Sequence, residues 1–208
     1  MGTDIHGFVE CTDSWGDEPW SAAIDLGLLY GGRDYDAFGC LFGVRNFAGF
    51  RPLAEGRGLP EDVAPAVREE FAGWGRDAHG ATWIGWAELK RVDWSEPAER
   101  VDARIHEYRR TPDGWVMTGK AAWSPRVAEV ADLNRRRDPG RLVRYEEHEW
   151  PEGTEWPDGD DLRYRVERMT RRGAVPPDGA WKPVWTVMET LAALHGDENV
   201  RLTVWFDC

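Results

Sequence analysis

The chain has 208 residues, thirteen of them tryptophan, and a formal net charge of −12 at pH 7. Its length suits one substantial core with an additional lobe, and its negative charge argues against broad attachment to nucleic-acid phosphates. No apolar run approaches the ~20 residues of a membrane span, and no signal peptide is recognisable, so we expect a cytoplasmic protein. The three cysteines are widely spaced and indicate neither a disulfide framework nor a zinc site. We therefore expect reduced thiols.

The first predicted element is a strand over residues 4–11, because apolar and polar residues alternate there. Its polar face carries Asp4, His6 and Glu10. Asp4 and His6 stand about 7 Å apart on that face, and an aspartate oxygen with a histidine nitrogen suits zinc, manganese or iron. The structural alternative is that Asp4 caps a turn while His6 donates to a backbone carbonyl.

Two helices and a further strand or turn are predicted next. Residues 37–44 suit a short buried helix with Asp34 or Asp36 as its cap. A proline near its first turn predicts a second helix over about 64–73. Residues 82–89 suit a strand or turn that passes into a short helix.

An anion site is predicted around the first helix. A helix N-terminus offers unpaired N–H groups to anions, and guanidinium groups bind phosphate or carboxylate through two parallel hydrogen bonds. The predicted substrate-binding residues are Arg33, Asp34, Arg45 and Asn46. In the alternative interpretation, the aspartate caps the helix and the arginines pair with nearby carboxylates.

The loop before residue 82 repeats the Asp-x-His spacing of the first strand, with Asp77 and His79. Two such pairs supply four ligands to one metal ion, or one pair binds the metal while the other serves as general acid or base. We assign Asp77 and His79 to catalysis, and His79 also to the metal ligands. The structural alternative is a hydrogen-bonded loop that leads into the next element.

Residues 93–182 differ from their surroundings by runs of charge and by proline and glycine turns. Short strands of a polar, partly exposed sheet are expected there, over residues 101–108, 115–118, 141–145 and 162–169. We predict an inserted lobe or cap that tunes ligand choice, placed between the two parts of a core domain, residues 1–92 and 183–208.

The chain closes with a helix over about 183–194, which a glycine ends, and an alternating strand over residues 200–207. If the two terminal strands pair antiparallel, Asp207 lies beside Asp4 and His6, and two carboxylates and an imidazole meet at one end of the sheet. The predicted fold class is therefore α+β: a mixed or antiparallel sheet that includes both terminal strands, helices on one face, and an inserted polar lobe.

Several motifs follow one another in a defined order: Met1-Gly2-Thr3-Asp4-Ile5-His6, Gly32-Arg33-Asp34-Tyr35-Asp36, Gly43-Val44-Arg45-Asn46, Arg57-Gly58-Leu59-Pro60, Asp77-x-His79 and Trp205-Phe206-Asp207. Together they resemble a family of small uncharacterised proteins from bacteriophages and bacteria, marked by an N-terminal MGxDIH motif and a C-terminal WFD motif. The resemblance covers residues 1–92 and 183–208, and it implies no particular activity. In residue types alone, the Asp-x-His pairs also resemble calcineurin-like metallophosphoesterases.

These residues predict a metal-dependent hydrolase that acts on a small phosphoester or nucleotide-like substrate. Zinc or manganese bound by Asp4, His6, His79 and Asp207 would polarise the scissile group and lower the pKa of its bound water. Two alternatives stay open. One is a non-enzymatic protein that binds and sequesters a small-molecule or peptide ligand, and the other is a tailoring enzyme that acts on a peptide or natural product.

Overall fold

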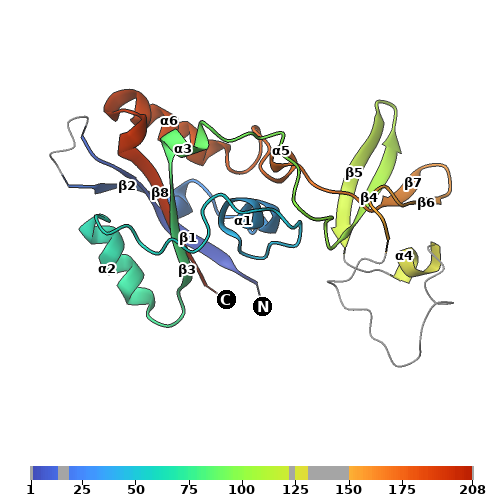
Figure 1. Cartoon of the computed structure of the whole chain (residues 1–208), viewed down its shortest axis with the longest axis horizontal. Helices are drawn as coiled ribbons and strands as arrows, with labels where there is room; N and C mark the ends of the chain where they lie inside the picture. Colours follow the sequence, from blue (N-terminus) through green and yellow to red (C-terminus); the bar gives the residue numbers. More distant parts are fainter. Residues whose placement is uncertain (1, 14–18, 122–124, 131–149, 208) are drawn as a thin grey trace. The chain divides into compact units, whose positions relative to one another are not determined.

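The computed structural model of the chain describes residues 2–13, 19–121, 125–130 and 150–207 (Figure 1). The chain divides into two compact units. Unit 1 consists of Met1–Asn46, Arg51–Glu96 and Arg171–Cys208, and unit 2 consists of Phe47–Phe50 and Pro97–Thr170. Residues 93–96 and 171–182, which we expected in the inserted lobe, therefore group with unit 1.

Unit 1 holds the elements β1 (Asp4–Cys11), β2 (Ser21–Asp25), η1 (Leu26–Leu28), α1 (Tyr35–Phe42), α2 (Pro65–Trp74), β3 (His79–Gly85), α3 (Trp86–Leu89), α5 (Arg171–Ala174), α6 (Lys182–His195), η3 (Asp197–Asn199) and β8 (Val200–Asp207). Unit 2 holds β4 (Ile105–Thr111), β5 (Gly114–Ala121), α4 (Pro125–Val130), β6 (Glu155–Asp158) and β7 (Leu162–Arg165). Within the described residues, no helix combines the length and the apolar composition that a membrane crossing requires.

Unit 1 is built on an antiparallel sheet of four strands in the order β2-β1-β8-β3. β1 and β8 pair along their whole lengths, with Asp4 opposite Asp207 and Cys11 opposite Val200. The predicted α+β class and the presence of both terminal strands in one sheet are therefore confirmed. The edge strand β2 was not predicted, because it is short and lacks a clear apolar alternation.

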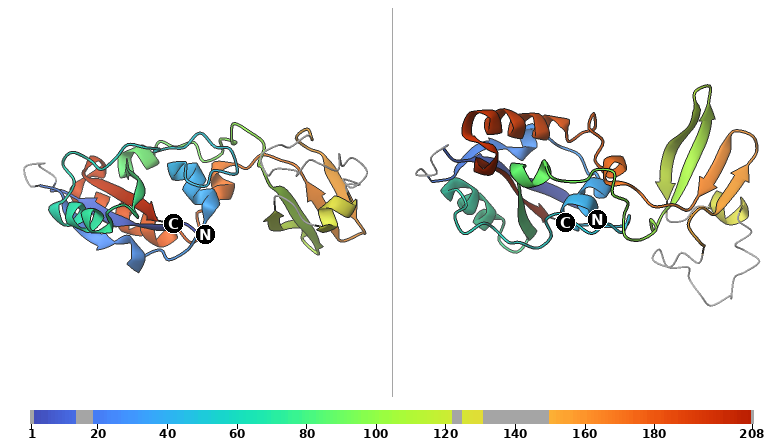
Figure 2. Two further views of the ribbon diagram at one scale, coloured as in Figure 1. Left: turned by 90° about the horizontal axis from the view of Figure 1, so that it is seen from below. Right: turned by 45° about the horizontal axis from the view of Figure 1, so that its top comes forward.

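Helices cover both faces of this sheet, whereas we expected them on one (Figure 2). On one face, the rings of Phe38 and Phe42 from α1 lie 5.4 and 6.0 Å from the ring of Phe206, and α6 covers the same side (Figure 2). On the other face, Phe71 of α2 packs edge-on against Trp205, with ring centroids 5.5 Å apart. The alternation of polar and apolar residues in β1 and β8 predicted that one face of the sheet is exposed to solvent. In the structure, helices cover both faces.

Paired charges make the burial of the polar strand face possible. Glu10 is fully buried and accepts hydrogen bonds from Arg201 at 3.0 Å, Thr203 at 2.5 Å and the backbone N–H of Ala64 at 2.7 Å. Arg201 also donates to Asp62 at 2.7 Å. Since each buried charge has partners, the cost of removing it from water is offset. These contacts let α2 lie directly over the polar side of β1 and β8.

Local sequence signals explain the ends of α1. The side chain of Asp34 accepts hydrogen bonds from the backbone N–H groups of Asp36 and Ala37, at 3.1 and 3.2 Å, so the predicted aspartate cap is confirmed. At the other end, Gly43 adopts a left-handed conformation with φ of 79°, which glycine tolerates better than other residues. The helix is thereby held between two loops that carry Arg33 and Arg45.

Unit 2 contains a second antiparallel sheet, in the order β5-β4-β7-β6. Among its described residues, Ile105, Val127 and Tyr164 form a small apolar cluster with a few half-buried neighbours. β4, β5 and β7 overlap the strands predicted over 101–108, 115–118 and 162–169. The strand predicted over 141–145 lies outside the described residues, and the role of this unit as a cap stays a prediction.

Candidate functional site

The site predicted from the sequence lies at one end of the unit 1 sheet, where β1 begins and β8 ends. The backbone N–H of Asp4 donates to Asp207 Oδ1 at 3.3 Å, and His6 Nε2 lies 3.6 Å from Asp207 Oδ2. The predicted convergence of Asp4, His6 and Asp207 is therefore confirmed. We call these three residues, together with Arg33 and Arg45, the strand-end cluster.

Both arginines of the cluster reach it from the loops that flank α1. Arg33 donates to both carboxylate oxygens of Asp4, at 2.5 and 2.7 Å, and these hydrogen bonds lower the pKa of Asp4. Arg45 Nε donates to the hydroxyl of Thr3 at 3.0 Å, and its guanidinium lies 5.9 Å from the centre of the Tyr35 ring. The two guanidinium groups thus contact consecutive residues at the start of β1.

The backbone around the cluster is adapted to these contacts. Arg45 adopts a left-handed conformation with φ of 54°, which is uncommon outside glycine and is found when surrounding contacts enforce it. A side chain at Gly2 would collide with the guanidinium of Arg33, so only glycine allows the close approach of this arginine. The N-terminal motif and the loop before α1 are therefore coupled by packing as well as by charge.

The other two predicted substrate-binding residues have structural contacts instead. Asp34 occupies the N-terminal N–H groups of α1 as a cap, so these groups are not free for the anion that we expected there. Asn46 packs closely on Gly39, where an added Cβ would lie 2.7 Å from its Cα. Of the predicted anion site, only the two arginines remain as candidates.

His79 reaches the same end of the sheet but lies on the opposite face from His6. It pairs with Phe206 on β8 and stacks on the ring of that residue, with centroids 6.2 Å apart. His6 pairs with Trp205, and the two rings are 6.4 Å apart. Because consecutive residues of a strand point to opposite faces, the two histidines are separated by the sheet. Asp77 is exposed in the turn before β3.

The residues present do not fit the predicted metal centre. Both oxygens of Asp4 are taken by Arg33, and His79 is on the other face, which leaves only His6 and Asp207. In the parts of the chain that the structure describes, no three His, Cys, Asp or Glu side chains are grouped to hold a metal ion. Zinc sites in proteins use three or four such ligands.

A cavity of about 670 Å³ lies beside Trp74, whose ring contacts that of His6. The two rings are 4.0 Å apart, and Trp74 lines the cavity together with Phe8, Glu69 and Asp77. His6 Nε2 is itself buried and makes no hydrogen bond to the residues that the structure describes, since the 3.6 Å to Asp207 Oδ2 exceeds hydrogen-bond length.

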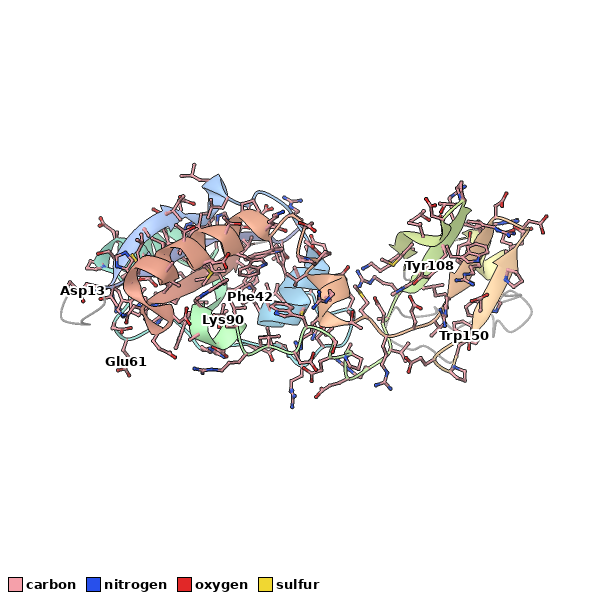
Figure 3. The ribbon with its side chains drawn as sticks, turned by 90° about the horizontal axis from the view of Figure 1, so that it is seen from above. Asp13, Phe42, Glu61, Lys90, Tyr108 and Trp150 are labelled. Atoms are coloured by element: carbon pink, nitrogen blue, oxygen red, sulfur yellow. The ribbon has the colours of Figure 1, made fainter. Side chains whose placement is uncertain are left out.

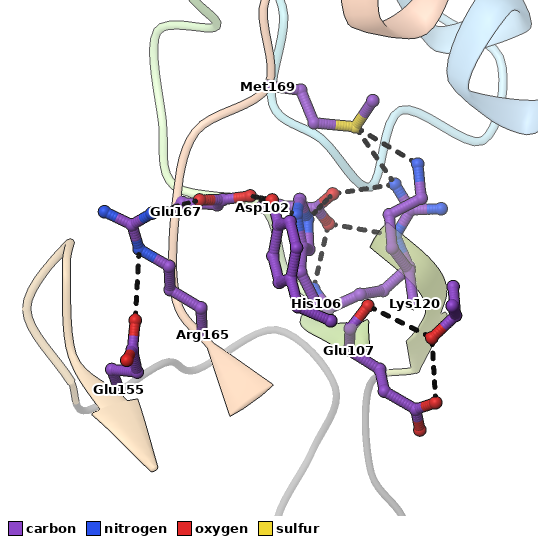
Figure 4. A network of polar contacts seen from close by, with 11 residues as sticks. Asp102, His106, Glu107, Lys120, Glu155, Arg165, Glu167 and Met169 are labelled. Atoms are coloured by element: carbon purple, nitrogen blue, oxygen red, sulfur yellow. Dashed lines mark hydrogen bonds and ion pairs between the residues drawn. The ribbon is translucent and has the colours of Figure 1, made fainter. Parts of the chain in front are cut away.

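A buried ionic network in unit 2 was not predicted (Figure 4). His106 is 1% exposed, and its two ring nitrogens each lie 2.9 Å from a carboxylate oxygen, one of Asp102 and one of Glu167. Both ring nitrogens are therefore engaged by carboxylates within the network. Arg104 donates to both oxygens of Asp102, at 2.9 and 2.8 Å, and Tyr108 donates to Glu167.

Both nitrogens of His106 are engaged within the network, so neither is left for proton transfer to a ligand. Burial by itself raises the pKa of the Asp102 carboxyl, but the hydrogen bonds from His106 and Arg104 and the charge of Arg104 outweigh burial and hold this pKa far below its usual range. In the sequence, only the presence of a histidine in a predicted strand pointed to this network. Its partner Glu167 is 61 residues away.

Comparison with models of known protein families, with curated proteins and with solved structures finds no match to this chain. A function for the strand-end cluster therefore rests on its geometry.

Proposed function

We propose that unit 1 binds a small ligand carrying a phosphate or carboxylate group at the strand-end cluster. The observation that carries this proposal is the convergence of Arg33 and Arg45 on the sheet end that also holds Asp4, His6 and Asp207. Guanidinium groups bind such anions through paired, charge-assisted hydrogen bonds. The side chain of Arg33 is 55% exposed, so that an anion reaches it from solvent while Asp4 keeps it in position.

Hydrolysis of a bound phosphoester is a second candidate, and the state of His6 favours it. A general base needs a ring nitrogen that is free to take a proton from water, and a neighbouring carboxylate that orients the ring and stabilises its charged form. Within the described part of the chain His6 Nε2 makes no hydrogen bond, and Asp207 Oδ2 lies 3.6 Å away. No step of this proposal uses a metal.

The relation to the phage and bacterial family and the cytoplasmic location stay predictions.

Binding is tested by calorimetric titration with inorganic phosphate, methyl phosphate and acetate. We expect Arg33→Gln and Arg45→Gln each to weaken binding at least tenfold, which is about 1.4 kcal/mol. Arg91→Gln is the matched control, because Arg91 is an exposed arginine of unit 1 that pairs with Glu198 away from the cluster. Equal phosphate affinity in all three variants, each with an unchanged circular dichroism spectrum, would contradict the proposal.

Hydrolysis is tested by the release of 4-nitrophenol from 4-nitrophenyl phosphate. We expect His6→Gln to abolish turnover and to leave the affinity for inorganic phosphate within about twofold, because the arginines that bind the anion remain. If a chelator abolishes turnover, hydrolysis depends on a metal ion. This result would contradict the metal-free candidate and support the metal-dependent hydrolase predicted from the sequence. Absence of turnover in the unmodified protein, with phosphate bound, leaves binding as the function.

A further inference from the structure

A second cavity in unit 1 has a different character from the strand-end cluster. It lies among α3, α5 and α6 and has a volume of about 250 Å³. Its walls carry three indole rings, those of Trp86, Trp94 and Trp185, with two cationic side chains, Lys90 and Arg172. The remaining lining residues are aliphatic or proline. None of these residues belongs to the strand-end cluster.

The aromatic walls of this cavity are held by the core of unit 1. The ring of Trp185 stacks on that of Trp181, with centroids 5.4 Å apart and an angle of 20° between the planes. Trp181 is buried and stacks in turn on Tyr30 at 4.5 Å. Trp185 is therefore the outer ring of a stack that begins in the core. On the facing side, the backbone N–H of Arg172 donates to the carbonyl of Trp94 at 2.8 Å.

The two cations of the cavity differ in their partners. Lys90, labelled in Figure 3, donates to Asp197 at 2.6 Å, so its charge is largely offset. Arg172 is exposed, and its guanidinium makes no hydrogen bond or ion pair within the described residues. The pKa of Asp93 is lowered mainly by hydrogen bonds from Ser95, and the charge of Arg172 adds a smaller through-space contribution. The rim of the cavity therefore presents a guanidinium whose hydrogen-bond donors are open to a ligand.

We propose that this cavity binds a planar aromatic ligand of one or two rings that carries a negative charge, such as an arene carboxylate. Indole faces stack on aromatic rings, and the volume lies just below the roughly 300–1,000 Å³ of sites for larger organic ligands. Three indoles alone would also attract an organic cation. Arg172 opposes a cation and favours a carboxylate, which it can bind through two hydrogen bonds.

The test is calorimetric titration of the full chain with 1-naphthoate, 1-naphthylmethylammonium and cyclohexanecarboxylate. We expect 1-naphthoate to bind at least tenfold more tightly than the other two probes, because only this probe has both the ring and the negative charge. Equal affinity for cyclohexanecarboxylate would overturn the role of the indoles. Tighter binding of 1-naphthylmethylammonium would overturn the role of the cations.

Variants separate this cavity from the strand-end cluster. Trp185→Leu and Arg172→Gln are each expected to weaken 1-naphthoate binding at least fivefold and to leave the affinity for inorganic phosphate unchanged, while the neighbouring control Arg91→Gln leaves both affinities unchanged. Arg172 is exposed and its guanidinium has no partner among the described residues, so its substitution tests the site even if Trp185→Leu does not fold. Unchanged 1-naphthoate binding in Arg172→Gln would overturn the assignment of the ligand to this cavity.

Discussion

The two units share a sheet topology of four antiparallel strands but are stabilised by different interactions. In unit 1, β8 is buried at every position except Asp207, between aromatic side chains on both faces. In unit 2, most residues of β5 are exposed, and a buried network of charges around His106 supplements a small apolar cluster. Unit 1 is therefore expected to respond most to loss of volume, and unit 2 to loss of charge.

The largest expected effect is that of Phe206→Ala in unit 1. Phe206 is fully buried against Phe38 and Phe42, and removal of such a ring leaves a cavity that costs about 3–5 kcal/mol. Urea denaturation followed through the amide signals of unit 1 measures the loss. Val116→Ala in unit 2 is the control, because this side chain is 50% exposed and its truncation should stay within about 0.5 kcal/mol. Similar losses of unfolding free energy in both variants would contradict the expectation that unit 1 responds more strongly than unit 2 to loss of volume.

A smaller effect is expected from Asp102→Asn in unit 2. At pH 7 the variant loses charge-assisted hydrogen bonds to Arg104 and His106, at a cost of about 1.5–3 kcal/mol. Because the pKa of Asp102 is lowered in the folded protein, the stability it provides is present above the pKa of the unfolded carboxyl, about 3.9, and is lost as the pH falls towards the folded value. The difference between variant and parent should therefore shrink below about pH 4.

Urea unfolding at pH 7, 4 and 3, followed through the amide signals of unit 2, measures this difference. Asp113→Asn is the matched control, since Asp113 lies exposed in the turn between β4 and β5. A difference that is the same at all three pH values would show that shape, rather than charge, sets the contribution of Asp102.

The smallest effect is expected from Arg57→Lys on the surface of unit 1. Arg57 donates to both carboxylate oxygens of Glu88, at 2.8 and 2.6 Å, and to the carbonyl of Leu53 at 2.8 Å. Lysine cannot reproduce this fork, but partly exposed pairs contribute little, so we expect a loss of about 0.5–1 kcal/mol in thermal or urea unfolding. A loss of unfolding free energy above about 2 kcal/mol would show that this partly exposed pair contributes as much to stability as the buried ionic networks do.

Short-range features of this protein were determined by its sequence. Alternation predicted β1 and β8, and the position of Asp34 before an apolar run predicted the cap of α1. Once two terminal strands with matched polar faces pair antiparallel, Asp4 and Asp207 meet. These predictions succeed because periodicity, caps and the pairing of strand ends depend on nearby residues and on simple strand geometry.

The tertiary structure alone decided what those residues contact. It pairs Asp4 with Arg33, and it places His79 on the face opposite His6. The four predicted metal ligands therefore do not meet at one position. In unit 2 it brings Glu167 to His106. The physical reason is that alternation tells which residues share a strand face, whereas partners and burial depend on which distant segment covers that face, and charged side chains are buried only where such partners meet.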